Sequence, residues 1–415
     1  MKQNPHYILI EIAEVPYLMP VGQAIADHKR GLKTNATGAY LWNLFRQERS
    51  LEDVLALSAS HYEISPDRLS SFREDISLFI WQLLHLGILT DSAEIRETSS
   101  SVKQNILASR DAAKKSQTAT ADTGIAPAET ILRFLSIGGL TLCLTCPEDA
   151  FSPEFSSFLL SSPHQKVPEA QQAIILHPDI PKDELNGDVL LHNPELNIIE
   201  SESAYLLQFP AAHRHLEIHL SKDGHTAHCY SLPPYDADFR YDFFHAIRLV
   251  YLYLAQKSGM VALHSASILY QNKLWLFSGP SGTGKSTHTN LWNKLLGTPI
   301  INGDLNLLAI ENDNPVVHGI PWCGTSGIYD TKTYPLGGII LLEQAKENHI
   351  ESLSPDQKRL LVSQRLISPA WTDKLWHEVF QPIDAIADKI LICKLHCTKE
   401  NNAVEVIKNE LSISR

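Results

Sequence analysis

Residues 279–286 read Gly-Pro-Ser-Gly-Thr-Gly-Lys-Ser, a complete G-x-x-x-x-G-K-S pattern. Glycines at these positions let backbone N–H groups turn inward around phosphate oxygens. The apolar run at residues 273–277 predicts a buried strand before the pattern, and residues 287–296 predict a helix after it. Strand, loop and helix in this order are the context in which the pattern binds a nucleotide phosphate. The alternative is a glycine turn that binds no phosphate.

The loop predicts a set of nucleotide contacts. We expect Lys285 to bridge the β- and γ-phosphates of ATP and Ser286 to ligate Mg²⁺. The predicted cofactor-binding residues are Gly279, Ser281, Gly282, Thr283, Gly284, Lys285, Ser286 and Thr287.

Phosphoryl transfer also needs an acid and a positioning group near the loop. Asp304 follows a strand-like apolar run, where a second carboxylate on the magnesium side belongs, although a turn aspartate is the alternative. His264 lies on an apolar run fifteen residues before Gly279, so one hairpin would return it to the loop; a structural histidine is the alternative. The predicted catalytic residues are Asp304, His264 and Lys285, and the predicted metal ligands are Ser286 and Asp304.

A glycine-punctuated loop at residues 321–327 follows the strand-like run 316–320. It is a candidate contact to the γ-phosphate or to the substrate. The alternative is a tight turn around a core tryptophan.

Residues 1–91 form a compact N-terminal block. Residues 6–12 predict a strand, and a polar turn at residues 27–31 predicts the tip of a hairpin. Helices are expected at residues 38–47, 51–60 and 66–85, followed by a short wing at residues 87–89. A hairpin, three helices and a wing predict a winged-helix arrangement.

This block resembles the PqqD-like family of precursor-peptide recognition domains at residues 35–42, 49–54 and 75–79. The resemblance implies that a leader peptide adds as an extra strand beside the hairpin and packs on the third helix. A DNA-binding winged helix is one alternative, which the few basic residues of the third helix, Arg68 and Arg73, disfavour. A purely structural domain is the other.

Residues 92–130 are rich in Ser, Thr, Ala and charged residues, and they predict a flexible linker, with a transient helix as an option near residues 104–115. Residues 131–415 resemble the HPr serine kinase family, which shares the phosphoenolpyruvate-carboxykinase type of nucleotide-binding fold. The matching stretches are residues 264–265, 279–287, 302–304, 319–324 and 334–339.

The resemblance implies that His264, Lys285, Ser286 and Asp304 surround the transferred phosphate. The family carries two adjacent acids where this chain has Gly303-Asp304. Whether Asp304 acts as general base, as metal ligand or as both therefore stays open.

The composition excludes several classes of protein. The net charge of −12 disfavours a nucleic-acid binder, which needs a basic face. No apolar run approaches the length of a membrane span, and the N-terminus lacks the pattern of a signal peptide. We therefore expect a cytoplasmic protein that binds neither nucleic acid nor a membrane, and the sequence leaves open whether it forms a homo-oligomer.

The sequence thus predicts an α/β protein with a winged-helix (α+β) domain in residues 1–91, a linker in residues 92–130 and a P-loop kinase domain in residues 131–415. Within the kinase domain, residues 131–255 are the flanking subdomain and residues 256–415 the nucleotide core. We expect an ATP- and Mg²⁺-dependent serine kinase that phosphorylates a Ser or Thr hydroxyl of a ribosomally synthesised precursor peptide, bound through its leader by residues 1–91. The alternatives are a kinase of a small metabolite or of free serine, and a nucleotide-gated scaffold that presents a peptide to partner enzymes.

Overall fold

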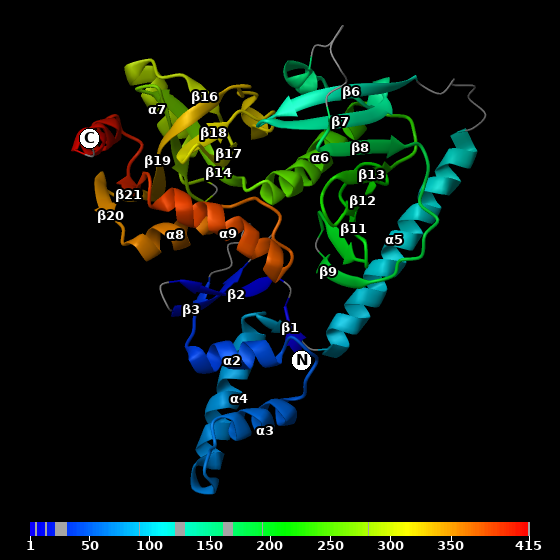
Figure 1. Ribbon diagram of the computed structural model, residues 1–415, viewed down its shortest axis with the longest axis vertical. Helices are drawn as coiled ribbons and strands as arrows, with labels where there is room; N and C mark the ends of the chain where they lie inside the picture. The colour runs from blue at the N-terminus through cyan, green and yellow to red at the C-terminus, as the bar shows by residue number, and fades with distance from the viewer. Residues whose placement is uncertain are drawn as a thin grey trace.

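The computed structural model describes residues 1–4, 6–12, 15–20, 31–90, 92–120, 129–160, 169–192, 194–280 and 282–413. The fold is mixed α/β, as expected, and is built on two large mixed sheets with helices packed against them (Figure 1). None of the helices in these ranges is long and apolar enough to cross a membrane.

The N-terminal unit contains a small sheet and three main helices. Its elements are β1 (Lys2–Gln3), β2 (Tyr7–Ile12), β3 (Val15–Pro20), β4 (Leu32–Lys33), α2 (Ala36–Leu44), α3 (Leu51–His61), η1 (Pro66–Arg68), α4 (Leu69–His85) and β5 (Leu89–Thr90). The expected helices are confirmed because their caps form: the Asn35 side chain accepts from the N–H of Gly38, and Ser50 and Asp53 make a capping box on α3.

The small sheet contains two antiparallel pairs, β2 with β3 and β3 with β4. Strand β2 ends at Ile12 and pairs antiparallel with β3, which begins at Val15, so the chain reverses between these two residues. The tip expected at residues 27–31 falls largely outside the described residues.

One face of this hairpin packs on the C-terminal half of the chain. Ile8, Ile10 and Met19 are buried in a cluster with Trp376 and Ala370. Trp376 lies on α9 (Asp373–Ala387), and the preceding helix α8 (Pro355–Ser363) adds a partly buried leucine to the same cluster. The hairpin lies beneath these two helices in Figure 1. The N-terminal unit is therefore docked on the rest of the protein and not merely tethered to it.

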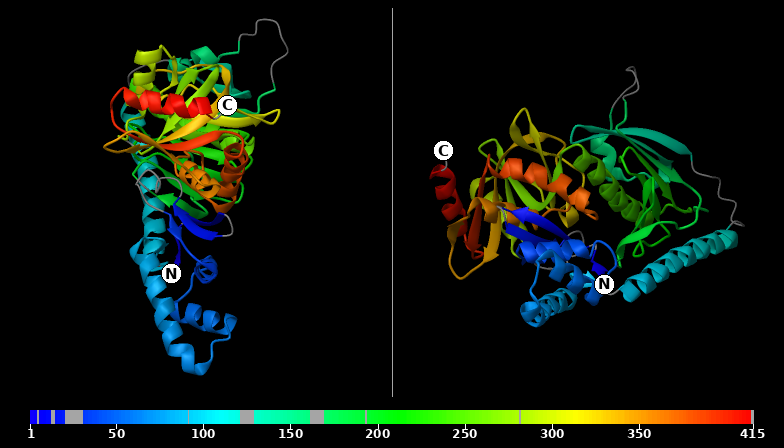
Figure 2. Two further views of the ribbon diagram at one scale, coloured as in Figure 1. Left: turned by 90° about the vertical axis from the view of Figure 1, so that its left-hand side faces the viewer. Right: turned by 60° about the horizontal axis from the view of Figure 1, so that its bottom comes forward.

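The expectation of a flexible linker is wrong for residues 92–120. These residues form α5 (Ser92–Thr120), a single helix of 29 residues that runs from the N-terminal unit along the side of the molecule (Figure 2). Val102 and Ile106 are buried against Ile199 of the first large sheet. The helix has few apolar side chains, but they recur at helical spacing and pack on the sheet. This packing stabilises the helix although its composition is mostly polar.

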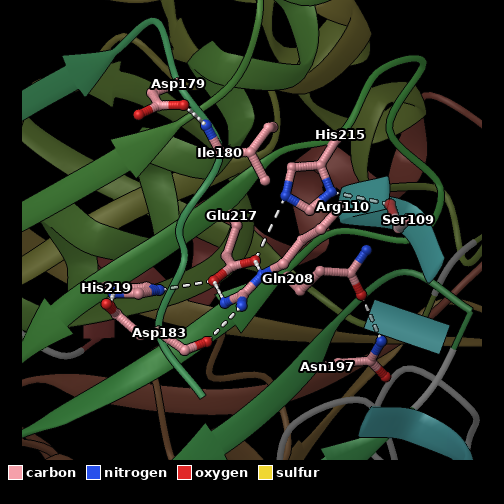
Figure 3. A network of polar contacts seen from close by, with 10 residues as sticks. All are labelled: Ser109, Arg110, Asp179, Ile180, Asp183, Asn197, Gln208, His215, Glu217 and His219. Atoms are coloured by element: carbon pink, nitrogen blue, oxygen red, sulfur yellow. Dashed lines mark hydrogen bonds and ion pairs between the residues drawn. The ribbon is translucent and has the colours of Figure 1, made fainter. Parts of the chain in front are cut away.

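A buried ion pair also holds α5 in place (Figure 3). The guanidinium of Arg110 donates to both carboxylate oxygens of Glu217, with Nε to Oε2 at 2.9 Å and Nη2 to Oε1 at 2.5 Å. His219 lies 2.6 Å from the same carboxylate, and His215 contacts both Glu217 and Ser109. Against the cost of burial, these hydrogen bonds hold the pKa of Glu217 well below its usual range.

We expect Arg110→Ala to lower the free energy of unfolding by about 3–5 kcal/mol, because it leaves the Glu217 carboxylate buried without its cation. The matched control is Arg214→Ala, which removes a surface pair with Asp236 and should cost about 0–1 kcal/mol.

The stability that Glu217 contributes should also depend on pH. Since the pKa of Glu217 is depressed in the folded state, its contribution to the free energy of unfolding is complete above the unfolded value of about 4.3 and is lost only as the pH falls further. Urea unfolding at neutral pH and at about pH 3 measures both effects. Equal costs for the two variants would contradict this account of α5.

The first large sheet has the order β6-β7-β8-β13-β12-β11-β10-β9. Its strands are β6 (Thr130–Ile137), β7 (Leu140–Pro147), β8 (Gln172–His177), β9 (Asp188–His192), β10 (Asn197–Glu200), β11 (Ala204–Gln208), β12 (Glu217–Ser221) and β13 (Thr226–Tyr230), with 3-10 turns η3 (Glu148–Ala150) and η4 (Pro153–Phe158) after β7. Helix α6 (Ala237–Lys257) buries its aromatic face in the same core. That core also takes in Leu305, Trp322 and Trp371, so the flanking region and the C-terminal region share one hydrophobic cluster.

The second large sheet carries the glycine-rich loop. Its elements are β14 (Val261–Tyr270), β15 (Lys273–Ser278), α7 (Lys285–Leu296), β16 (Ile300–Asn302), β17 (Leu305–Glu311), β18 (Asn314–His318), η5 (Gly324–Ser326), β19 (Thr333–Gln344), β20 (His349–Ser352), β21 (Leu391–Cys397) and α10 (Asn402–Ile413). Strand β19 pairs with β18 through its first residues and with β15 through its later ones, which closes β14, β15, β17, β18 and β19 into a ring. The partner changes near Gly337 and Gly338, where a Cβ would lie 2.6 Å and 2.7 Å from atoms of the Trp275 ring, so only glycine fits.

Candidate functional site

The glycine-rich loop joins β15 to α7, as the sequence predicts. The helix begins at Lys285, two residues earlier than expected, because Gly284 adopts a left-handed conformation (φ 109°) and caps it. The first bond within the helix runs from the N–H of His288 to the carbonyl of Gly284, so the three preceding N–H groups, from Lys285 to Thr287, are not used inside the helix. This helix end offers donors and a positive dipole end to an anion.

The loop is held in shape by its own contacts. Gly279 has no room for a side chain, since a Cβ would lie 2.6 Å from the Thr283 hydroxyl oxygen. Thr283 donates to the carbonyl of Pro280 at 2.7 Å, and Gln344 donates to the carbonyl of Gly282 at 3.0 Å. Ser281 lies outside the described residues, so its predicted contact stays a prediction.

The other predicted catalytic residues lie together beside this loop. His264 Nδ1 lies 3.3 Å from Asp304 Oδ1. His264 is on β14, and Asp304 sits in the turn between β16 and β17, both of which pair with β14. The Asn302 side chain fixes this turn by accepting the backbone N–H groups of Asp304 and Leu305.

Electrostatics links Lys285 to the same group. Burial and the Lys285 ammonium lower the pKa of the His264 imidazole, against the opposing effect of Asp304. Burial also lowers the pKa of Lys285, and the Asp304 carboxylate partly offsets that effect. At neutral pH His264 is therefore neutral, and its ring can accept a proton. Lys285 Nζ donates to the carbonyl of Gly279 at 3.2 Å.

The loop at residues 321–327 covers the Asp304 turn. A Cβ on Gly324 would lie 2.8 Å from the Cβ of Asp304, and one on Gly303 would lie 2.3 Å from the Ser326 hydroxyl oxygen. Trp322 is buried, which agrees with a tight turn around a core tryptophan. The contact to the γ-phosphate or to the substrate stays a prediction.

The oxygen donors suit a magnesium ion bound mainly through phosphates. No group of three or more His, Cys, Asp or Glu side chains able to hold a metal occurs in the described part of the chain. Ser286 is exposed at the start of α7, and the Asp304 side chain is 33% exposed. One hydroxyl and one carboxylate fit Mg²⁺, which usually takes one or two protein carboxylates together with substrate phosphates.

Two arginines near Asp304 carry no signal in the sequence. Arg248 lies on α6, far from any motif, and Arg365 follows α8. The carbonyl of Arg365 accepts the backbone N–H of His264 at 2.8 Å. Asp304 is the acid with the largest effect on the pKa of the Arg248 guanidinium, which it raises against burial. Only the folded topology brings these residues to the site.

Comparison with known proteins adds no assignment: no protein-family model and no curated protein sequence matches this chain.

Proposed function

We propose that this protein is an ATP- and Mg²⁺-dependent kinase that phosphorylates a serine or threonine hydroxyl of a ribosomally synthesised precursor peptide. The observation that carries the proposal is the convergence of Lys285, His264 and Asp304 on one end of the glycine-rich loop. The resemblances to the HPr serine kinase and PqqD-like families support a P-loop kinase core and a winged-helix domain that binds the leader peptide.

Each residue has a separate task in the proposed reaction. The backbone N–H groups of the loop and of the start of α7 hold the phosphates, and Lys285 neutralises charge on the β- and γ-phosphates. Ser286 and Asp304 hold Mg²⁺, which supplies further charge neutralisation. The acceptor hydroxyl gives its proton to Asp304 or to the neutral ring of His264. These two groups lie 3.3 Å apart, so either of them can take the proton from the same hydroxyl.

The peptide part of the proposal depends on the docked N-terminal unit. Its small sheet has the order β2-β3-β4, and an extended leader would add to an outer edge of this sheet. The hairpin and α5 both contact the rest of the protein, so the leader would be held at a fixed position relative to the active site. This arrangement raises the local concentration of the core peptide near the loop.

The outer surface of α4 offers an apolar contact for a leader. Leu78 and Trp81 are one helical turn apart and are 57% and 59% exposed, whereas Ile76 and Ile80 of the same helix are buried. Large apolar side chains exposed side by side on a small unit are typical of an interaction surface.

We therefore expect Leu78→Ser to raise the KM for the full-length precursor by about tenfold, as the loss of one buried anchor typically costs 1–2 kcal/mol. The KM for a leaderless core peptide should not change, because the chemistry lies elsewhere. The matched control is Leu107→Ser on α5, also exposed at 45%. The probe is a synthetic precursor peptide, prepared with and without its leader. Equal effects of Leu78→Ser on the two peptides would remove the leader-reading role and favour a metabolite kinase.

A further inference from the structure

Three cations, Lys285, Arg248 and Arg365, surround the pair of His264 and Asp304. The carboxylates of Asp304 and Glu195 act on Arg248, and Asp304 also acts on Lys285. The charge of Arg365 acts on Lys285 and on His264. Burial and the Arg248 guanidinium lower the pKa of the neighbouring His245 to about 4.

Packing fixes Arg248 toward Asp304. On α6, Phe244 and Tyr251 both place their rings against Trp322, with centroid distances of 5.6 Å and 5.2 Å. Arg248 lies four residues after the first and three before the second, so it shares their face of the helix. The carbonyl of Trp322 in turn accepts from Asn302, whose side chain holds the backbone of Asp304.

A different element fixes Arg365. Its backbone runs beside β14: the carbonyl of Arg365 accepts the N–H of His264, and the N–H of Ile367 donates to the carbonyl of Ala262. Leu366 forms a bridge with Leu263 between these two bonds. Arg365 is therefore held beside the catalytic histidine by a short strand-like pairing, and its positive charge acts on both His264 and Lys285.

Neither guanidinium has a partner among the residues that the structure describes. Both side chains are half-buried, and no hydrogen bond or ion pair joins either of them to another residue in the described ranges. Other arginines of the chain do pair, as Arg110 does with Glu217 and Arg359 with Asp384 and Asp388. A partly buried charge without a partner is costly, so a site that keeps two of them beside a phosphate-binding loop is built for an anion.

We infer that Arg248 and Arg365 bind the γ-phosphate of ATP and stabilise the phosphoryl group during its transfer. The inference rests on the proposed kinase function and adds two residues and a preference for the triphosphate. Guanidinium groups suit this task because they stay charged and donate two parallel hydrogen bonds to phosphate oxygens. A site with one acid needs no additional cations to bind a metal ion. The positive charge of the two arginines therefore suits the phosphate.

The test compares nucleotide binding with turnover in Arg248→Gln and Arg365→Gln. The full-length protein is titrated calorimetrically with Mg-ADP and with a non-hydrolysable Mg-ATP analogue, and kcat is measured with the precursor peptide. We expect each variant to bind ADP within about twofold of the wild type but to lose about tenfold in its preference for the triphosphate, as for a charged hydrogen bond. We expect kcat to fall by about 100-fold or more, as for other groups that stabilise the transferred phosphoryl group.

Two further variants keep the test decisive. Arg240→Gln on the same helix removes an arginine that donates to the carbonyls of Asp149 and Tyr235, and it should leave the triphosphate preference unchanged. Arg248→Lys keeps the charge and should restore part of the preference, which also covers the case in which Arg248→Gln does not fold. An unchanged preference in both Gln variants, with a wild type that binds and turns over ATP, would overturn the inference alone. A wild type that binds neither nucleotide would overturn the proposed function together with it.

Discussion

Lys285→Ala is expected to lower kcat for peptide phosphorylation by about 100-fold or more while leaving the fold intact. The Lys285 ammonium is the cation carried by the glycine-rich loop itself, at the first position of α7. Its Nζ donates to the carbonyl of Gly279, and within the described part of the chain no ion pair joins it to a carboxylate, so little stability should be lost with it. The loss therefore falls on transition-state stabilisation and not on stability.

The measurement is release of ADP with the full-length precursor peptide as acceptor, together with the thermal unfolding midpoint of each variant. Lys294→Ala is the matched control, because Lys294 is exposed near the other end of the same helix. Turnover retained by a well-folded Lys285→Ala protein, at a level near that of Lys294→Ala, would contradict the kinase proposal.

The second large effect is expected for Asp304→Asn, which should lose nearly all turnover yet still bind nucleotide. Asparagine keeps the shape that packs against Gly324, but it can neither accept a proton nor neutralise Mg²⁺. The loop and the start of α7 supply most of the phosphate contacts, so the Kd for Mg-ADP should change by only a few-fold. His264→Ala should be milder if the histidine positions the acid and does not accept the proton itself.

Calorimetric titration with Mg-ADP and single-turnover kinetics separate binding from chemistry in this variant. Glu311→Gln is a suitable control, since Glu311 lies at the far end of β17, the strand that Asp304 precedes. A wild-type rate for Asp304→Asn would place the base elsewhere. A loss of nucleotide binding equal to the loss of rate would make Asp304 chiefly a metal ligand.

Local patterns in the sequence predicted much of this structure. The strand–loop–helix around residues 279–286 is confirmed because glycine conformations and helix caps act within a few residues. The caps at Asn35 and Ser50 located two N-terminal helices for the same reason. The hairpin of β14 and β15 returns His264 to the loop, as its spacing from Gly279 predicted. Its closeness to Asp304 was implied only by the resemblance to the HPr serine kinase family.

The parts that sequence reasoning missed depend on distant contacts. Residues 92–120 are polar and predict a linker. They form a docked helix because Arg110 pairs with Glu217, which lies more than one hundred residues away in the sequence. The hairpin tip expected at residues 27–31 lies largely outside the described residues, in the part of the sequence between the antiparallel strands β3 and β4. Arg248 and Arg365 belong to no motif and reach the site only through the packing of α6 on Trp322 and the pairing beside β14.

The docked N-terminal unit changes how the leader-reading role should be tested. Removing residues 1–91 would uncover Trp376 and its neighbours on α9, so a loss of activity after deletion would not distinguish lost leader binding from a damaged kinase surface. Substitutions on the exposed face of α4 leave that interface in place.

Transfer of a radiolabelled γ-phosphate from ATP to the synthetic precursor peptide tests the central claim most directly. The full-length peptide, the leaderless core peptide and free serine are offered separately, and the labelled residue is located by mass spectrometry. The account predicts label on a Ser or Thr of the core region, with a kcat/KM higher for the full-length peptide than for the leaderless one. Label on free serine alone, or ATP binding without transfer to any of the three acceptors, would contradict it.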